Sequence, residues 1–437
     1  MTALGETGAE LEVDSILDGG KANLFHFVVL GVVALGFALE GLAAQAFGLA
    51  LPALSHAWHL PRAAFATSTA VGLVGFALGA AAAGYGGDRL GRRTILIVSI
   101  GLFGAATAAT GLAHNLTQLG CVRFATGLGL GGSIPVAAAL MAELSPARWR
   151  RLAIALGFMC LPLGGFVSGM MASQLLPTRG WSGLFIACGA LALALGVLVF
   201  ILLPESPSYL ALRPDRRDEL DRLLRRLGLT SPPPAASASR ARWADLFARE
   251  VRSQTLVLLA TYFFLLLGMY LIFSWGPSVL NSRGLSLAQA SEALSAFALG
   301  GVFAGPVSGW TTQALGPKRA AVLLGVLAVA AAAGLSWLCT RQPLNGAAVM
   351  GGVFLLGHAV SGVQTALYAL AAEIYPAHIR SSGVGAAVAA GRIGAVLSSY
   401  LGVFAIGLGG ASSFFLFVAG ALVLSMGATL FAKRTPT

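Results

Sequence analysis

Long runs of apolar residues recur along the chain, separated by short polar segments. Each run has about 20 residues or more, which is the length that an α-helix needs to cross roughly 30 Å of hydrocarbon. Segments of about ten alternating residues, typical of a membrane barrel, do not occur. The pattern predicts an all-α membrane protein with twelve transmembrane helices, at residues 24–52, 64–86, 94–113, 117–141, 152–175, 183–203, 255–279, 290–315, 319–339, 346–372, 382–405 and 411–432.

One long polar segment, residues 204–252, separates the twelve predicted helices into two groups of six. It contains three consecutive prolines and the short amphipathic stretch PDRRDELDRLLRR. The first predicted helix is too long for a cleaved signal peptide, so we expect it to be retained. The predicted organisation is a cytoplasmic tail (1–23), a six-helix bundle (24–203), a cytoplasmic linker (204–252), a second six-helix bundle (253–432) and a cytoplasmic tail (433–437).

Two pairs of similar segments indicate that the second half of the chain repeats the first. GYGGDRLGRR, from Gly84, follows the second predicted helix, and GWTTQALGPKR, from Gly309, follows the eighth. ELSPARWR, from Glu143, ends the fourth, and EIYPAHIR, from Glu373, ends the tenth. Nearly the same number of residues separates the members of each pair, which indicates duplication. Two six-helix repeats around an axis along the membrane normal are typical of transporters with a site near the midplane.

The basic residues are distributed unevenly between the two sides of the predicted bundle. The net charge of +11 would suit nucleic-acid binding if the charge were clustered on a polar domain. Of the 28 lysines and arginines, however, only four fall in predicted outer loops: Arg62, Arg179, Arg283 and Arg341. Arg123 and Arg392 fall inside predicted helices, and all the others lie on the opposite side. By the positive-inside rule, both termini are predicted to be cytoplasmic, and we expect no nucleic-acid partner.

Enzymatic chemistry has little support in the sequence. The four cysteines lie in apolar segments without metal-ligand spacing, so we interpret them as buried small side chains: Cys121, Cys160, Cys188 and Cys339. No phosphate-binding loop, nucleophile elbow or HExxH motif occurs, and the polar segments are too short for a catalytic domain. We therefore expect a non-enzymatic membrane protein without a metal or cofactor, working as a monomer in a bacterial inner membrane.

The segment after the second predicted helix resembles the signature of the major facilitator superfamily. The matching residues are Gly84, Asp88, Arg89, Gly91, Arg92 and Arg93. The glycines allow a tight turn, and the charged residues can form a cytoplasmic latch that breaks when the two halves rock. The second copy has Gln313 where an acid is expected, so its latch should be weaker.

Further segments resemble the aromatic acid:proton symporters of that superfamily. They are RFATGLGLGGSIP from Arg123, PLGGFVSG from Pro162, LPESPSYL from Leu203, and YALAAEIYPAHIRSSGVGAAVAAGRIGA from Tyr368. EGLAAQAFG, from Glu40, looks most like members that import phenylpropionate-type acids. The family usually carries a second acid three residues after the first, where this chain has Ala43. The resemblance implies import of a benzoate, hydroxybenzoate or phenylpropionate type of monocarboxylate with protons, and the departure at Ala43 bears on proton coupling.

Two charged residues inside the first half are candidates for proton coupling. Glu40 lies near the middle of the first predicted helix. A carboxyl group holds its proton more tightly when buried and less tightly beside a cation, so a site of alternating exposure can load and release a proton. A structural hydrogen bond is the alternative for Glu40. Arg123 resembles the arginine of the superfamily's fourth helix and is predicted to be a cationic partner, with snorkelling to the outer headgroups as the alternative.

Arg392 lies about ten residues into the eleventh predicted helix, too deep to reach water easily. A guanidinium group offers a planar fork that matches a carboxylate in two hydrogen bonds. We therefore predict that Arg392 binds the carboxylate of the substrate; a fixed salt bridge is the alternative. An aromatic substrate also needs flat apolar surfaces and a few polar partners. The candidates are Tyr262, Tyr270, Trp275, His358, Gln364 and Tyr368, for all of which packing is the alternative.

Charged residues at the cytoplasmic helix ends are candidates for gating. Glu143 and Glu373 end the fourth and tenth predicted helices, beside Arg148 and Arg380. We interpret them as gate or latch partners, with simple capping charges as the alternative. Several transport functions stay open: an aliphatic carboxylate importer, an organic-cation or drug porter, or an uncoupled facilitator or receptor in which Ala43 has removed the coupling.

Overall fold

The computed structural model describes residues 24–432 except 146, 212, 228–245, 250 and 376. The expected tails and part of the expected linker therefore lie outside the described residues. The elements are α2 (Leu24–Ala57), η1 (Arg62–Phe65), α3 (Ala66–Leu90), α4 (Arg92–Thr110), α5 (Leu116–Leu144), α6 (Ala147–Leu202), α7 (Pro207–Ala211), η2 (Pro214–Arg216), α8 (Arg217–Leu227), α9 (Arg252–Ser282), α10 (Leu287–Leu315), α11 (Pro317–Leu338), α12 (Gly346–Ile374) and α13 (Ala377–Leu430).

The described chain has ten helices long and apolar enough to cross a membrane. Two of them are about twice the length of the others: α6 has 56 residues and α13 has 54. Each contains a break with non-helical backbone angles, at Gly180 in α6 and at Gly409 and Gly410 in α13. At Gly180 and Gly410 φ is positive, at 66° and 67°, a conformation that glycine adopts without steric cost. Each of these helices therefore crosses twice, and the predicted all-α fold with twelve crossings is confirmed.

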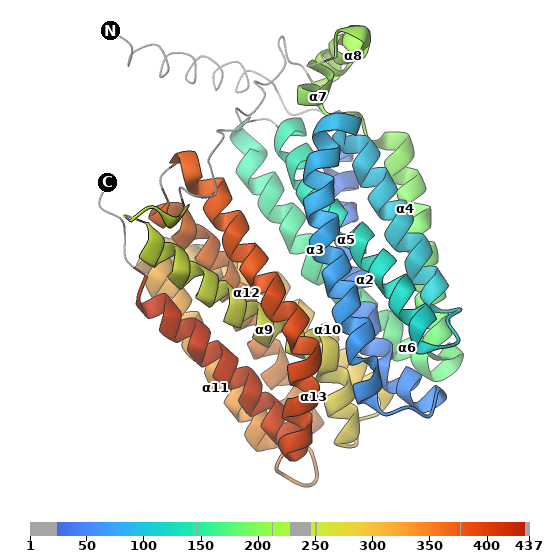
Figure 1. Ribbon diagram of the computed structural model, residues 1–437, viewed down its shortest axis with the longest axis vertical. Helices are drawn as coiled ribbons and strands as arrows, with labels where there is room; N and C mark the ends of the chain where they lie inside the picture. The colour runs from blue at the N-terminus through green and yellow to red at the C-terminus, as the bar shows by residue number, and fades with distance from the viewer. Residues whose placement is uncertain are drawn as a thin grey trace.

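The helices form two bundles that lie side by side in Figure 1, one from α2 to α6 and the other from α9 to α13. In the first bundle α2 packs on α6, α3 packs on α5, and α4 packs on both α5 and α6. In the second, α9 packs on α13, α10 packs on α12, and α11 packs on both α12 and α13. The pairs correspond one to one, as expected for a duplicated six-helix unit. The bundles meet where α3 packs on α13, α6 on α10, and α2 on α9.

Short polar residues begin several of the helices at the loops. The side chain of Asn115 accepts a hydrogen bond from the Gln118 amide at the start of α5, and Asn345 caps α12 in the same way. Ser286 forms a capping box with Gln289 at the start of α10. These caps satisfy backbone donors that a helix start leaves without partners, so each of these helices starts at a residue fixed by local sequence.

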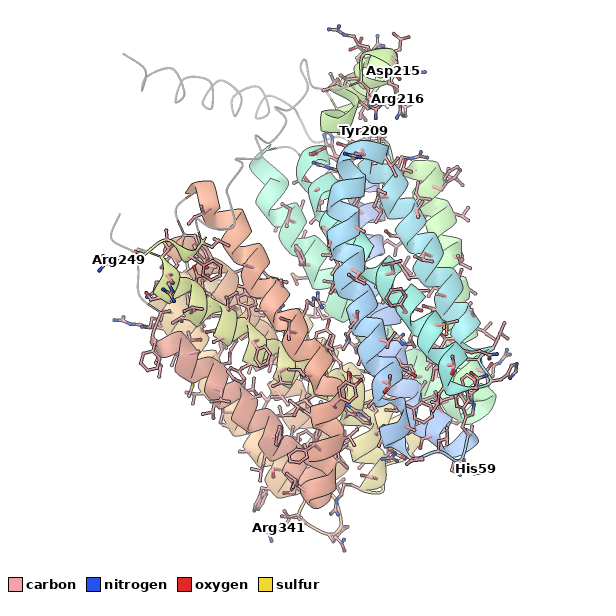
Figure 2. All side chains as sticks on the ribbon, viewed as in Figure 1. His59, Tyr209, Asp215, Arg216, Arg249 and Arg341 are labelled. Carbon is pink, nitrogen blue, oxygen red and sulfur yellow. The ribbon has the colours of Figure 1, made fainter. Side chains whose placement is uncertain are left out.

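Polar helices and loops mark the two ends of the molecule. α7 and α8 project at one end, where Figure 2 labels Tyr209, Asp215 and Arg216; His59 and Arg341 are labelled at the opposite end. The Arg226 guanidinium of α8 lies 5.8 Å from the centroid of the Phe25 ring, so α2 starts at the α8 end. Because arginines are concentrated there, the positive-inside rule predicts that this is the cytoplasmic end.

The buried apolar residues form two clusters, which lie at different positions along the membrane normal in the first bundle. One cluster extends through the second bundle and into the first, where it takes in residues near the outer loops, such as Leu54, Phe65, Leu119 and Leu184. The other contains residues of the first bundle, α7 and α8, such as Val33, Leu96, Leu140 and Val199, which lie closer to the cytoplasmic end. The cores of the two bundles are therefore continuous toward the outer side and separate toward the cytoplasm.

Candidate functional site

Glu40 is buried in the middle of α2, with 3% of its surface exposed. Its carboxylate oxygen Oε2 accepts a hydrogen bond of 2.9 Å from the Ser133 hydroxyl of α5. The same hydroxyl lies 2.8 Å from the Leu130 carbonyl oxygen. A serine hydroxyl has one proton and two lone pairs, so it cannot donate to both oxygens at once. If Glu40 is protonated, it can donate to Ser133 while Ser133 donates to Leu130; if Glu40 is ionised, Ser133 can donate to it.

Arg392 of α13 lies at the interface of the two bundles. Its guanidinium carbon Cζ is 4.0 Å from the centroid of the Phe76 ring of α3 and 5.7 Å from that of Tyr270 of α9. Its Nη1 donates to the Tyr270 hydroxyl. Among the residues that the structure describes, the ion pairs are Arg92–Glu143 and Arg216–Glu219, so no described carboxylate pairs with Arg392.

Two further tyrosines extend the aromatic surface beside Arg392. The rings of Tyr262 and Tyr368 are 5.8 Å apart and meet edge to face. Tyr262 is fully buried, and its hydroxyl has no hydrogen-bond partner. Tyr368 interacts with Gln364 and with the charge of Arg392, and it is 40% exposed, so a ligand can reach its ring. Arg392, Tyr262, Tyr270, Gln364 and Tyr368 were all predicted as substrate-binding residues, and the fold places them in one cluster.

Two other predicted substrate-binding residues lie in contacts between helices. Trp275 is buried in the second bundle, where a Cβ atom added at Gly402 would lie 2.3 Å from its ring. Its Nε1 atom has no partner. His358 is half-buried on α12, and its backbone nitrogen lies close to Gly300 of α10. Both residues thus lie in helix packing contacts, and their substrate role stays a prediction.

Arg123 of α5 is buried, with 8% of its surface exposed. Its Cζ lies 4.6 Å from the centroid of the Phe47 ring of α2, and its Nε has no hydrogen-bond partner. This burial disfavours the alternative that the side chain snorkels to outer headgroups. A cation over the face of an aromatic ring is stabilised by the ring's quadrupole, which accounts for a buried guanidinium group without an acid beside it among the described residues.

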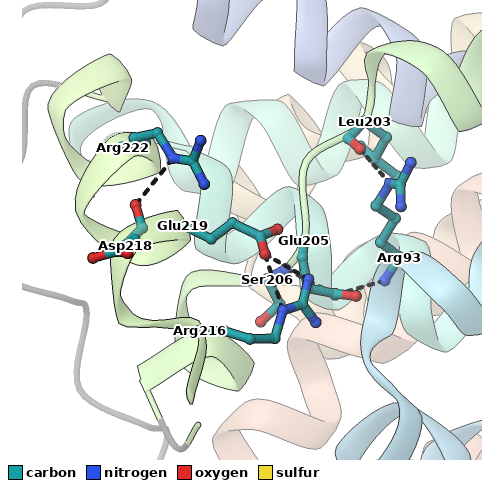
Figure 3. A network of polar contacts seen from close by, with 8 residues as sticks. All are labelled: Arg93, Leu203, Glu205, Ser206, Arg216, Asp218, Glu219 and Arg222. Atoms are coloured by element: carbon teal, nitrogen blue, oxygen red, sulfur yellow. Dashed lines mark hydrogen bonds and ion pairs between the residues drawn. The ribbon is translucent and has the colours of Figure 1, made fainter. Parts of the chain in front are cut away.

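A network of polar contacts holds the cytoplasmic end of the first bundle together (Figure 3). The Arg93 amide donates to Glu205 Oε1 at 2.9 Å, and its guanidinium donates to the carbonyl oxygens of Leu203 and Phe200, each at 2.6 Å. Glu205 also accepts from the Ser206 amide. The turn needs glycine at Gly91, where φ is 96° and a Cβ would lie 2.4 Å from Glu205.

A second part of this network involves the predicted gating residue Glu143. It pairs with Arg92 and also accepts a hydrogen bond from the Ser206 hydroxyl. The Arg89 carbonyl accepts from Arg213 at 3.0 Å. The side chains of the other predicted gating residues, Asp88, Arg148 and Arg380, lie outside the described residues, and Glu373 is exposed. The partners Glu205 and Ser206 were missed by the sequence prediction, although both lie in LPESPSYL, which carried the family resemblance.

The second copy of the motif makes different contacts. Lys318 donates to the carbonyl oxygens of Leu430 and Ala432, each at 2.7 Å, and so fixes the end of α13. Gln313, which replaces the expected acid, is exposed. The weaker latch expected from Gln313 stays a prediction.

Comparisons with known proteins show the family of the chain. The Major Facilitator Superfamily matches residues 33–342 and 282–437. A gallate transporter of Pseudomonas putida is 33% identical over 92% of this chain and 90% of that protein. A 4-hydroxybenzoate transporter, PcaK, of the same species is 31% identical over 93% and 92%, and a 3-(3-hydroxy-phenyl)propionate transporter of Escherichia coli (strain K12) is 32% identical over 84% of each.

Solved structures show the same fold. The inward open conformation of the xylose transporter XylE from E. coli matches with a TM-score of 0.74 and 19% identity, over 94% of this chain and 97% of that one. A bacterial homolog of the human lysosomal transporter Spinster, in an inward-facing and occupied conformation, matches with a TM-score of 0.73 and 15% identity, over 95% and 98%. The chain is thus a multi-pass membrane transporter, not an enzyme, and it belongs to the Major Facilitator Superfamily.

Proposed function

We propose that this transporter imports an aromatic monocarboxylate with protons across the bacterial cytoplasmic membrane, with both termini in the cytoplasm. The observation that carries the proposal is the environment of Arg392. Its guanidinium packs on the ring of Phe76 and donates to the Tyr270 hydroxyl, with Tyr368 nearby and no described carboxylate paired with it. A cation without a paired acid attracts an anion, and aromatic walls suit a ring attached to that anion.

The substrates named for the relatives support the aromatic part of the proposed substrate. They name gallate, 4-hydroxybenzoate and 3-(3-hydroxy-phenyl)propionate, each of which has a single carboxylate and an aromatic ring. An aliphatic carboxylate would use Arg392 but leave the aromatic surfaces without a matching group. An organic cation would be repelled by Arg392, which disfavours the porter for cationic drugs.

The surroundings of Glu40 support proton coupling. The Ser133 hydroxyl can donate to ionised Glu40, or accept from protonated Glu40 while it donates to the Leu130 carbonyl oxygen. Glu40 can therefore keep its hydrogen bond with Ser133 in both protonation states without a change in the backbone. We propose that the charge of Arg392 also acts on Glu40, so that an anion bound to Arg392 would change the electrostatic field at the proton site. This gives the substrate and the proton a direct physical link.

Transport would proceed by rocking of the two bundles about this central site. The cytoplasmic contacts of Arg92 and Arg93 lie within the first bundle in this conformation. We propose that they keep that bundle rigid while the bundles separate on the cytoplasmic side. A latch function for Asp88, Arg89, Arg148, Glu373 and Arg380 remains part of the proposal, as does a role of Arg123 in tuning the proton.

The competing function is an uncoupled facilitator. Ala43, which stands where related symporters usually carry a second acid, is buried in α2 with 1% of its surface exposed. If coupling needs both acids, the chain would equilibrate its substrate without accumulating it. The Glu40–Ser133 hydrogen bond favours coupling by the single remaining acid.

The test is uptake of labelled 4-hydroxybenzoate into liposomes that contain the full chain, with protein-free liposomes as the control for passive entry. We expect accumulation above the outside concentration when the outside is acidic, and its collapse with a protonophore. Glu40→Gln should exchange substrate but no longer accumulate it. Equilibration without accumulation in the wild type would support the facilitator, and no uptake beyond protein-free liposomes for any aromatic acid would overturn the proposal.

A further inference from the structure

The ring of Phe76 lies against Arg392 from the opposite bundle. Phe76 belongs to α3 and is 7% exposed, whereas Arg392 belongs to α13. The 4.0 Å between the ring centroid and Cζ places the cation close to the ring, where the negative π-face attracts it. Because α3 and α13 pack against each other, this contact is made across the interface between the bundles.

The backbone of Phe76 is held firmly by α5. A Cβ atom added at Gly131 would lie 1.9 Å from the Phe76 carbonyl oxygen, and one added at Gly127 would lie 2.9 Å from the Phe76 nitrogen. Only glycine allows two helix backbones to come this close. Since α5 also carries Ser133, the ring of Phe76 and the hydrogen bond of Glu40 are positioned by the same helix. The position of the ring is therefore set by backbone packing and not by side-chain contacts alone.

The chemistry of the guanidinium group shows what this contact does. Its N–H donors point outward in the plane of the group, so a carboxylate binds at an edge and a ring can pack on a face without competing. Tyr270 takes a hydrogen bond from Nη1, which leaves donors on the remaining edges. A ring on the face and a hydroxyl at one corner fix both the tilt and the rotation of the group.

We propose that Phe76 is a positioning residue for substrate binding: it holds the Arg392 guanidinium in the orientation that receives the substrate carboxylate. This rests on the proposed function, in which Arg392 receives that carboxylate. Orientation before binding reduces the entropy that the complex loses, so it strengthens binding without a contact between Phe76 and the carboxylate. No feature of the sequence marked Phe76, which is one of 24 phenylalanines in the chain.

The experiment replaces Phe76 in the full chain by mono-, di- and trifluorinated phenylalanine. Fluorine withdraws electron density from the ring and weakens its negative face while nearly keeping its shape. We expect the affinity for 4-hydroxybenzoate, measured by calorimetry, to fall at each step, to a total of about three- to tenfold, because an interaction of about 0.7–1.4 kcal/mol corresponds to that factor. A role in packing alone predicts a flat series, and a flat series or a rising affinity would overturn the proposal.

Two controls keep the outcome specific. Phe103 of α4 is also fully buried in the first bundle, with no cation over its ring among the described contacts, so the same fluorinated series there should leave affinity unchanged. Phe76→Tyr should bind nearly as well as the wild type and Phe76→Leu more weakly; equal binding by these two variants would count against the proposal.

Arg392→Ala separates this proposal from the proposed function. If Arg392→Ala removes binding while the Phe76 series is flat, only the positioning role of Phe76 fails. If Arg392→Ala leaves binding unchanged, the proposed substrate site fails.

Discussion

Buried and half-buried charged side chains carry the proposed chemistry of this transporter, and each has a different physical support. Glu40 has a hydroxyl that can act as donor or acceptor, Arg392 has two aromatic rings and a phenol, and Arg123 has one ring. Neither Arg392 nor Arg123 forms an ion pair with an acid among the described residues. A charge in the apolar part of a membrane costs about 2.5–3.5 kcal/mol on insertion scales, so groups left in this state are expected to have functional partners.

Removal of the Ser133 hydroxyl should alter the proton response. In Ser133→Ala the ionised form of Glu40 loses a hydrogen bond to a charged group, whereas the protonated form loses a weaker, neutral one. The difference of about 1 kcal/mol corresponds to somewhat less than one pH unit. We expect the pH profile of proton-driven uptake to move to higher pH by about that amount, because ionisation becomes less favourable. Ser133→Thr keeps the hydroxyl and should keep the profile. An identical profile for the alanine variant would show that Ser133 does not act on the titrating group.

The sequence predicted Arg392 and Tyr270 of the candidate site but not Phe76 and Ser133, which contact the predicted residues. Arg392 and Tyr270 stood out because polar groups at membrane depth are rare and need an explanation. Phe76 and Ser133 did not stand out, since a phenylalanine or a serine in an apolar helix has many ordinary roles. Their significance comes from contacts with residues far along the chain, and periodicity contains no information about which helix faces which. Trp275 is the opposite case, a residue that the sequence singled out. An aromatic side chain at this depth suits ligand binding, but it equally suits the packing against Gly402 that the structure has.

Helix contacts in the first bundle depend on glycine at specific positions. Along the α3–α5 interface, added Cβ atoms at Gly79 and Gly131 would lie 2.0 Å from the Leu128 carbonyl oxygen and 1.9 Å from that of Phe76. In a membrane, where apolar side chains gain little by leaving lipid for protein, such close approach is a main source of helix association. This explains why many of the 57 glycines lie within helices although glycine disfavours helices in water.

A single methyl group should therefore disturb this interface. In Gly131→Ala the helices must separate or bend, at a cost of about 1–3 kcal/mol for overpacking, so we expect a melting temperature several degrees lower in detergent. The control is Gly101→Ala in α4, where an added Cβ meets nothing within 4 Å. It should be neutral or slightly stabilising, since alanine favours helices. Equal melting temperatures for the two variants would show that the α3–α5 contact is not tight.

Element boundaries were predicted well where the sequence contains a local signal. The predicted helix at 117–141 corresponds to α5 (Leu116–Leu144), which Asn115 caps. The sequence predicted two helices separated at residues 176–182. The structure has instead one helix, α6, with a break at Gly180, where φ is positive. The connection is too short for a separate loop. Apolar length alone gives the number of crossings but does not show how two of them are joined.

At the scale of the whole molecule, the structure has the two bundles joined on the outer side. Arg62 of η1 donates to the Ser278 carbonyl oxygen and to Asn281 Oδ1 at 2.9 Å, both at the outer end of α9. The apolar core is also continuous between the bundles at this end. Both observations correspond to a conformation closed toward the outside. An outward-open state requires these contacts to break.

Loss of the Arg62 contacts should shift the conformational equilibrium. Two hydrogen bonds between the bundles stabilise the outward-closed state, so Arg62→Ala is expected to raise the outward-open population by about tenfold for a loss of 1.4 kcal/mol. Spin-label distances between the outer ends of α3 and α10 would report the shift. The control is Arg341→Ala, an exposed outer arginine whose described contacts stay within the second bundle. Unchanged distances in Arg62→Ala would mean that apolar packing alone closes the outer side.

The most direct measurement is the affinity of the full chain and of Arg392→Ala for 4-hydroxybenzoate and for 4-hydroxybenzamide, which has a similar shape but no charge. Removal of a guanidinium that binds a desolvated carboxylate should weaken 4-hydroxybenzoate binding at least about thirtyfold, since a charge-paired group contributes 2 kcal/mol or more. The amide should bind weakly to both proteins and lose little. A wild-type affinity for 4-hydroxybenzoate in Arg392→Ala, or an equal loss for the acid and the amide, would contradict the assignment of Arg392 as the carboxylate receptor.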